Sequence, residues 1–420
     1  MALEIGTATD HADLFAKLRT FLVAGENASQ TLTFAGNGAD GETVTIGTKT
    51  YTLQSSLTDS DGNVQLGANA EETIDNLVAA INLDDGAGTR YAASMTLHPT
   101  ALAVKSSSST LVARAKTPGT GGNALATTDT VANASWGDST MTGGGLGAWT
   151  ELDYNSTDNT AIYQAPGLSG TEEIHMGFGY VADPGTDAYA LTGWMFRSYN
   201  ALLAHQSQPG HSGLGYHPVW NTSIPYWFVA NGQRVIIVTK ISTVYTASYL
   251  GKVLPYGVPG EWPQCYYLGM PQAANTRWSS TSENFRNFWD PGNNIGTRML
   301  NPDGNWYNVQ NFSDSSGSEI ASTNQNFIWP YQAAIGSANS ARVRWREIRD
   351  NVDGSRTLVP LILCGSNPSI DIWGELHGAF AVSGFNAASE DIIVEGGEKH
   401  LLVQNVFRTA RYYYAAIKLS

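Results

Sequence analysis

The alternation of apolar and polar residues predicts one helix at the N-terminus and strands along most of the remaining chain. Within residues 10–23, a single helical stripe carries Leu14, Phe15, Leu18, Phe21 and Leu22. Asp10 precedes the stripe and is placed to cap the helix. Because such a stripe has to be buried, we expect it to pack on the main domain or on another subunit.

Residues 30–145 change to the two-residue period of half-buried strands. We expect strands at 31–34, 43–46, 49–53, 92–96, 101–105 and 111–115. Asn69-Ala70-Glu71-Glu72 is typical of a capping box and begins a helix with the apolar face Ile74, Leu77, Val78 and Ile81. A turn-rich loop at 117–123 and a glycine linker at 142–145 end the stretch. The pattern predicts a small α+β module.

Residues 146–420 contain many strand signals and little helical periodicity. Asn231-Gly232 joins two apolar runs, 223–230 and 234–238, which predicts a hairpin whose two turn residues have positive φ. We also expect a hairpin of 341–349 with 356–363, strands at 401–406 and 412–418, and a helical turn or two within 192–205. These elements predict a mainly β domain, with a β-sandwich or jelly-roll-like core.

Composition narrows the class of protein. Hydrophobic residues make up 42% of the chain and charged residues 14%, against roughly 25% charged in an average soluble protein. The net charge is −14, distributed as −2 over residues 1–29, −6 over 30–145 and −6 over 146–420. This balance disfavours sequence-specific nucleic-acid binding, which needs clustered cations. A neutral polar surface suits a protein covered by neighbouring subunits.

Cysteines and apolar runs bear on the compartment. Cys265 and Cys364 stand far apart in apolar surroundings, so buried free thiols are favoured over a disulfide. The N-terminal residues have neither the basic nor the apolar region of a signal peptide. Apolar runs such as 361–364 are much shorter than the ~18 residues of a membrane span. We expect a soluble protein made in the cytosol, with no membrane contact.

The search for chemistry yields weak candidates. His205, His211 and His217 recur every six residues, a spacing that suits loop packing better than a metal site. Acidic residues were considered for glycoside hydrolysis, which needs a carboxylate pair. They are Glu172, Glu173, Glu283, Asp290, Asp371, Glu375, Glu390 and Asp391. Nothing marks a catalytic pair, so we expect no catalytic, cofactor-binding or metal-binding residues.

One local basic stripe stands out. Arg342, Arg344 and Arg346 alternate with Val343 and Trp345, which would place three cations on one face of a strand. One interpretation is a solvated strand face paired to neighbouring acids. The other is a contact with an acidic neighbouring subunit.

The 30–145 stretch resembles a module found repeatedly in tailed-bacteriophage virion proteins. The resemblance lies in residues 40–47, 49–52, 77–82, 115–124 and 127–137. It covers nearly all of the stretch and implies no catalytic residues. Such modules are appended to several kinds of virion part.

The flanking sequence resembles a family of tailed-phage virion proteins. The similar residues are the N-terminal helix, 161–167, 220–234, 238–245, 249–251 and 255–256. In that family, the helix and the strand ending in Gln164-Ala165-Pro166-Gly167 flank a segment of variable content. The resemblance implies one main domain, 1–29 with 146–420, into which 30–145 is inserted.

The family's gene position, between head and tail genes, implies a neck or collar subunit at the head–tail junction. We therefore expect a non-enzymatic homo-oligomer in the virion, contacting other neck or tail proteins and using no cofactor. The alternative is a tail-fibre or baseplate protein that binds host glycans through aromatic loops. The aromatic candidates are Trp262, Tyr266, Tyr267, Trp278, Phe285, Phe288 and Trp289.

Overall fold

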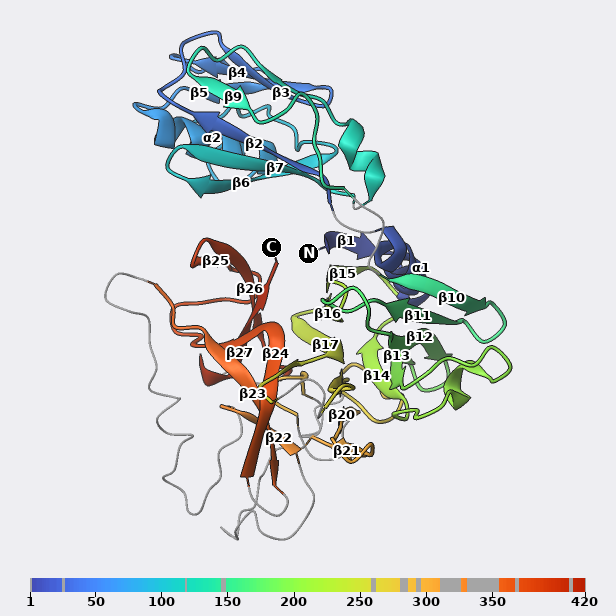
Figure 1. The fold of residues 1–420 in the computed structure, drawn as a ribbon. Coiled ribbons are helices and arrows are strands. Elements are labelled where there is room, and N and C mark those ends of the chain that lie inside the picture. The colour runs from blue at the N-terminus through green and yellow to red at the C-terminus, as the bar shows by residue number, and fades with distance from the viewer. Residues whose placement is uncertain are drawn as a thin grey trace. The chain divides into compact units, whose positions relative to one another are not determined.

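A computed structural model gives the fold (Figure 1). It describes residues 2–24, 27–117, 119–144, 149–257, 262–279, 286–291, 296–309, 326–330, 355–366, 370–407 and 411–419. The chain divides into two compact units, of which one is Ala24–Gly147 and the other combines Leu3–Val23 with Ala148–Ser420. Across the described residues, two α-helices accompany twenty-seven strands, which confirms the mainly β class.

The Ala24–Gly147 unit contains two four-stranded sheets and one helix. One sheet has the order β6 (Ala101–Ser107), β7 (Thr110–Ala115), β2 (Ser29–Phe34), β9 (Ala134–Trp136). The other has the order β5 (Asn63–Gln65), β4 (Lys49–Gln54), β3 (Thr43–Ile46), β8 (Thr127–Asp129). They share one apolar core with helix α2 (Ala70–Asn82). The short helix η1 (Thr120–Ala124) lies in the predicted 117–123 loop.

The predicted capping of α2 is confirmed. The Asn69 side chain accepts a hydrogen bond from the Glu72 backbone N–H at 3.0 Å. Ile74, Leu77 and Ile81 are fully buried, as the apolar face requires. The strand expected at 92–96 is wrong, since these residues form a turn and irregular backbone after an isolated bridge at Tyr91.

The larger unit contains three sheets. The central sheet has the order β1 (Ala2–Ala8), β15 (Ile224–Ala230), β16 (Arg234–Ile241), β17 (Val244–Lys252), β19 (Tyr266–Gly269), β20 (Thr297–Leu300), β21 (Trp306–Asn308). The five-stranded sheet has the order β10 (Thr150–Asn155), β11 (Thr160–Ala165), β12 (Ile174–Asp183), β13 (Ala188–Phe196), β14 (Gly215–Val219).

The C-terminal sheet completes this unit. Its order is β22 (Asn326–Trp329), β23 (Val359–Ser366), β24 (Ile370–Val382), β27 (Tyr414–Lys418), β26 (Glu398–Gln404), β25 (Ile392–Glu395), and β18 (Leu254–Pro255) also pairs with β24. Two short helices, η2 (His205–Ser207) and η3 (Arg411–Tyr413), lie in connections. The β26–β27 pair confirms the two strands expected near the C-terminus.

The central sheet is buried on both faces. Ile236 and Val238 belong to one apolar cluster with residues of the C-terminal sheet, such as Leu363 and Leu401. On the opposite face, a side chain at Gly193 of the five-stranded sheet would meet Leu250 at 2.9 Å. Burial on both sides explains why β15 and β16 are continuous apolar runs with no alternation.

The Asn231-Gly232 hairpin is confirmed, but its turn differs from the prediction. The last strand pair is Ala230 with Val235. The Asn231 side chain accepts hydrogen bonds from the N–H groups of Gln233 and Arg234, at 2.9 and 3.0 Å. This Asx-type capping replaces positive φ, which neither turn residue adopts.

Helix α1 (His11–Ala24) forms where the stripe predicted it. The Asp10 carboxylate accepts hydrogen bonds from Ala12 and Asp13, both at 2.9 Å. Its apolar stripe is at most 2% exposed and packs inside the larger unit, where Phe21 lies 5.6 Å from Phe228 and Phe15 lies 5.7 Å from Tyr180. Buried side chains of this size contribute up to about 1.5–3 kcal/mol each.

Two expectations in the larger unit are wrong or untested. The helical turns expected within 192–205 are wrong, because Ala188–Phe196 is the fully buried strand β13 and only His205–Ser207 is helical. The 341–349 half of the second expected hairpin lies outside the described residues.

Candidate functional site

The best-defined polar cluster lies on the face of the five-stranded sheet opposite the central sheet. Gly177 and Gly179 of β12 leave room on this face for side chains of the neighbouring strands. A Cβ at Gly177 would lie 2.1 Å from the Trp194 ring, and one at Gly179 would lie 2.8 Å from the Thr160 methyl group. The glycines therefore let the Trp194 indole lie directly against β12, in a small cluster with Ile162 and Phe196.

A β-bulge in β10 directs neighbouring side chains to opposite faces of this sheet. Glu151 pairs with Tyr163 and Asp153 pairs with Ile162, so Leu152 is the extra residue. Glu151 then faces α1, where it accepts two hydrogen bonds from Arg19 at 2.8 and 3.0 Å. Asp153 lies on the other face of the sheet, the face that carries Ile162 and Trp194.

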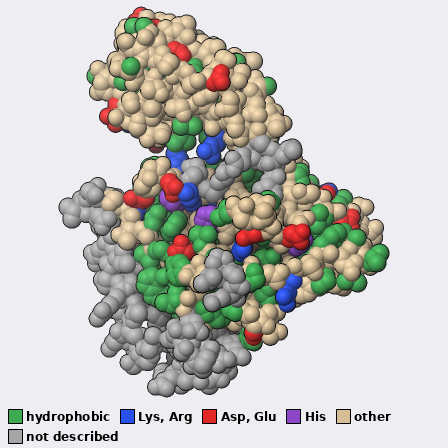
Figure 2. All heavy atoms as spheres, viewed as in Figure 1, with side chains coloured by type: hydrophobic (Ala, Val, Ile, Leu, Met, Phe, Trp, Pro, Cys, Tyr) green, Lys and Arg blue, Asp and Glu red, His purple; other side chains and the backbone are tan. Residues whose placement is uncertain are grey.

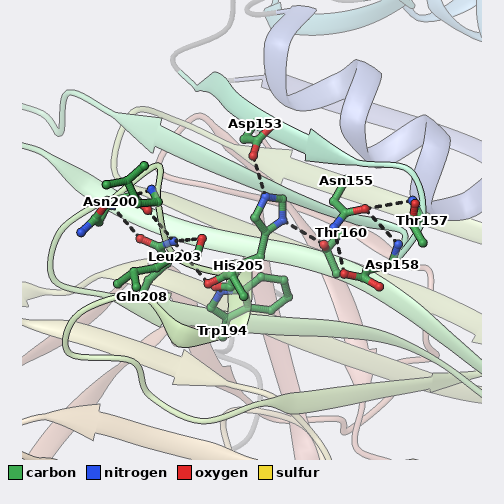
Figure 3. A network of polar contacts seen from close by, with 12 residues as sticks. Asp153, Asn155, Thr157, Asp158, Thr160, Trp194, Asn200, Leu203, His205 and Gln208 are labelled. Atoms are coloured by element: carbon green, nitrogen blue, oxygen red, sulfur yellow. Dashed lines mark hydrogen bonds and ion pairs between the residues drawn. The ribbon is translucent and has the colours of Figure 1, made fainter.

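His205 joins the bulged strand β10 to β11 (Figure 3). Its Nε2 lies 3.0 Å from Asp153 Oδ2, and its Nδ1 lies 2.8 Å from Thr160 Oγ1. Its backbone carbonyl accepts a hydrogen bond from Trp194 Nε1 at 3.0 Å. The hydrogen bond from His205 holds the pKa of Asp153 below its ordinary value.

The order carboxylate, imidazole, hydroxyl is that of an activated nucleophile. Here, however, Thr160 is 3% exposed, so its hydroxyl is hydrogen-bonded to the His205 ring in a place that solvent does not reach. The geometry supports positioning: the imidazole of His205 joins β10 and β11 to its loop, and the His205 carbonyl joins β13 to the same loop.

The loop that contains His205 is held rigidly. Gln208 is 2% exposed, and its amide donates to the carbonyls of Asn200 and Leu203, both at 3.1 Å. Its side-chain oxygen accepts from the Asn200 N–H at 2.7 Å (Figure 3). The same loop presents Leu202, which is 93% exposed, at its tip. We call residues 199–208 the contact loop.

The three regularly spaced histidines do not meet. His205 lies in the network above, and His211 Nδ1 accepts a hydrogen bond from the Gly213 N–H at 2.7 Å. His217 is fully buried, with Nδ1 2.6 Å from Ser248 Oγ and Nε2 2.8 Å from Thr239 Oγ1. Burial lowers the pKa of His217 to about 3, so the ring is neutral at physiological pH. Across the described part of the chain, no His, Cys, Asp and Glu group is arranged to hold a metal ion.

Three of the carboxylates considered for hydrolysis have separate local partners. Glu172 pairs with Lys252 at 2.7 Å, Glu390 with Lys240 at 2.5 Å, and Glu375 accepts from the Tyr256 hydroxyl at 2.7 Å.

Two further acids of that set also have local roles. Asp290 is 1% exposed beside Arg286, which lies 3.3 Å away, and accepts from Asn405 at 2.9 Å. Asp391 accepts from the Ala388 N–H at 2.7 Å. Glu283 and the side chain of Asp371 lie outside the described residues.

The aromatic residues considered for glycan binding are mostly core. Trp262, Tyr267, Phe288 and Trp289 belong to the cluster between the central and C-terminal sheets, and Tyr266 is 2% exposed. Trp278 is half-buried and packs edge-on to Trp220 at 5.5 Å. Phe285 lies outside the described residues. The expected aromatic sugar-binding surface is wrong for the five buried side chains.

Arg342, Arg344 and Arg346 lie outside the described residues, so their contacts stay a prediction. The expectation of free thiols is confirmed: Cys265 and Cys364 are buried and unbonded to each other. Burial raises the pKa of both thiols to about 12, which leaves them unreactive.

Comparison with known proteins gives no assignment: no family model and no curated protein matches this chain. Among the described helices, none has the length and apolar character needed to cross a membrane.

Proposed function

We propose that this chain is a non-enzymatic structural subunit of a tailed-phage virion, placed in the neck or collar at the head–tail junction. It acts as a homo-oligomer that contacts other neck or tail proteins. The proposal starts from the two sequence resemblances, one in residues 30–145 and one in the flanking domain.

The observation that carries the proposal is how the ends of the Ala24–Gly147 unit meet. Ser29 and Thr142 exchange backbone hydrogen bonds of 2.8 and 2.9 Å, so this unit begins and ends at one antiparallel bridge. The larger unit is interrupted between Val23 and Ala148. Arg19 and Glu151 form a bidentate ion pair that joins the two sides of this interruption. Closed ends on both sides support an inserted module of the kind appended to virion parts.

The stacked sheets support a structural role. Apolar side chains join the central sheet to the C-terminal sheet, and the five-stranded sheet covers the other face. We interpret the larger unit as a sandwich-type scaffold, with a jelly roll as the alternative. In Figure 2, the visible surface of the Ala24–Gly147 unit is mostly neutral with scattered carboxylates, as expected for a surface that does not hold DNA.

The tail-fibre or baseplate alternative depended on exposed aromatic loops. Five of those seven side chains are buried, so the neck or collar placement is the better supported of the two.

Immunogold electron microscopy of intact particles, with an antibody against residues 27–144, tests the proposal. We expect label at the head–tail junction. Label at fibre tips or the baseplate would favour the alternative, and particles without the protein would refute a virion role. Incubating the purified chain with host polysaccharide should release no reducing ends, and their release would refute the non-enzymatic assignment.

A further inference from the structure

The C-terminal sheet ends in an apolar strand with an open edge. Strand β25 (Ile392–Glu395) pairs with β26 on one side only, within the described residues, and lies at the end of its sheet (Figure 1). Ile392 is 45% exposed and Val394 is 55% exposed, both on the same face of the strand. Ile393 points to the other face and packs on the cluster of Val382 and Leu402.

Open apolar edges are uncommon, because they pair with other chains. The terminal strand of the five-stranded sheet, β10, carries Glu151 and Asp153 and is half-covered by α1 through Arg19. The β25 edge has no equivalent charge between Ile392 and Val394. Its row of backbone groups is therefore suited to adding a strand.

Charges at the two ends of β25 restrict which strand fits. Asp391 accepts the Ala388 N–H at 2.7 Å, and Glu395 accepts the Arg356 backbone N–H at 2.5 Å. Neither carboxylate has an ion-pair partner within the described residues. An antiparallel pair of two β25 strands would bring Asp391 of one copy towards Glu395 of the other, which like-charge repulsion disfavours.

The nearby cations are otherwise engaged. Lys418 pairs with Glu398, and the Arg356 guanidinium donates to the carbonyls of Ser383 and Phe385, both at 3.0 Å. Lys399 lies opposite Val394 in the strand register. The edge thus favours an extended partner that has apolar side chains in alternation with basic ones.

We propose that the β25 edge binds the Arg342–Arg346 segment of a second copy of this chain. This five-residue sequence alternates Arg342, Arg344 and Arg346 with Val343 and Trp345. Val343 and Trp345 cover Ile392 and Val394, while the arginines meet Asp391 and Glu395. The contact joins two different surfaces, so it propagates around a ring. This inference rests on the homo-oligomer of the proposed function.

The test uses a labelled peptide of residues 339–349 and the full-length R342Q/R344Q/R346Q variant, whose own segment cannot compete through its charges. Fluorescence anisotropy should show binding that weakens as salt rises. Adding I392K and V394K should weaken binding by at least about tenfold. The matched control is L202K, which changes an exposed leucine on the contact loop and should leave binding unchanged. Equal binding with and without the two β25 substitutions would overturn the proposal.

Sedimentation velocity over a concentration series then distinguishes a contact between two copies from a contact within one chain. Wild-type chain should self-associate, and both the I392K/V394K and the triple-glutamine variants should dissociate. A wild-type chain that stays monomeric and binds no peptide, beside a triple-glutamine variant that binds it, would place the segment on its own β25 and refute the contact between copies. If the protein is present in the particle but its β25 binds no peptide, only this inference is refuted. If β25 binds the peptide but the protein is absent from particles, only the virion role is refuted.

Discussion

Two buried histidines, His217 and His205, each connect several elements of the larger unit through hydrogen bonds. His217 joins β14 to β16 and β17 through Thr239 and Ser248, in a place without solvent. His205 joins β10, β11 and the contact loop. Neither role can be read from the six-residue spacing, because each ring meets partners that are 22 to 52 residues away.

Acid should destabilise the larger unit through His217. The pKa of His217 falls from 6.5 to about 3 on folding, so below pH 6.5 the unfolded chain binds a proton that the folded chain does not. Stability is therefore complete above about pH 6.5 and falls as the pH drops towards 3, by about 1.4 kcal/mol per pH unit for this residue. Urea unfolding at a series of pH values should show a shallower acid slope in His217→Gln. An unchanged slope would contradict the assignment.

At the scale of elements, the features that were predicted correctly depend on residues close together in the sequence. The Asp10 and Asn69 caps, the stripe of α1 and the Asn231-Gly232 hairpin are each encoded within a few residues. Strand β13 was mistaken for helical turns because burial on both faces removes the alternation that identifies a strand. The candidate site was missed, because Asp153 reaches His205 only through the β10 bulge and the register of β11. Gly177 and Gly179, two residues apart in β12, were its one local signal.

The contact between α1 and β10 should depend on the shape of the Arg19 side chain as well as on its charge. Arg19 makes two hydrogen bonds to Glu151, and its guanidinium lies 3.3 Å from the centre of the Tyr154 ring. Lysine keeps the charge but cannot form the bidentate pair. We expect Arg19→Lys to lower the free energy of unfolding by about 1–2 kcal/mol.

The matched control is Lys17→Gln, which removes an exposed pair with Asp13 at 3.9 Å and should change stability by under about 0.5 kcal/mol. Urea titrations followed by tryptophan fluorescence measure both variants. Equal losses in the two variants would show that the paired guanidinium has no special role.

At the scale of the whole molecule, the chain consists of two units with separate apolar cores. The core of the smaller unit involves α2 and both four-stranded sheets and includes no residue beyond Met141. The resemblance pointed to this division from sequence. The sequence could not show that the unit begins and ends at one hydrogen-bonded pair, because Ser29 and Thr142 are far apart in the chain and neither marks a motif.

Each unit should therefore fold without the other. Residues 27–144 expressed alone should unfold in one cooperative transition, and a chain in which a short Gly-Ser linker replaces them should keep the melting temperature of the larger unit. Calorimetry and circular dichroism measure both. A linker variant that does not fold, beside a folded 27–144 fragment, would show that the larger unit depends on the insert.

The Ser29–Thr142 bridge also determines how mechanical force enters the smaller unit. Both connecting segments leave from the same end of an antiparallel pair, so tension between them acts first on the hydrogen bonds of Asn27 with the end of β7 and of Gly144 with Asn123. The bridge is the next contact to be loaded, one hydrogen bond at a time. Stretching the surrounding domain would thus open these terminal contacts in sequence before it separated the interior strands of either sheet.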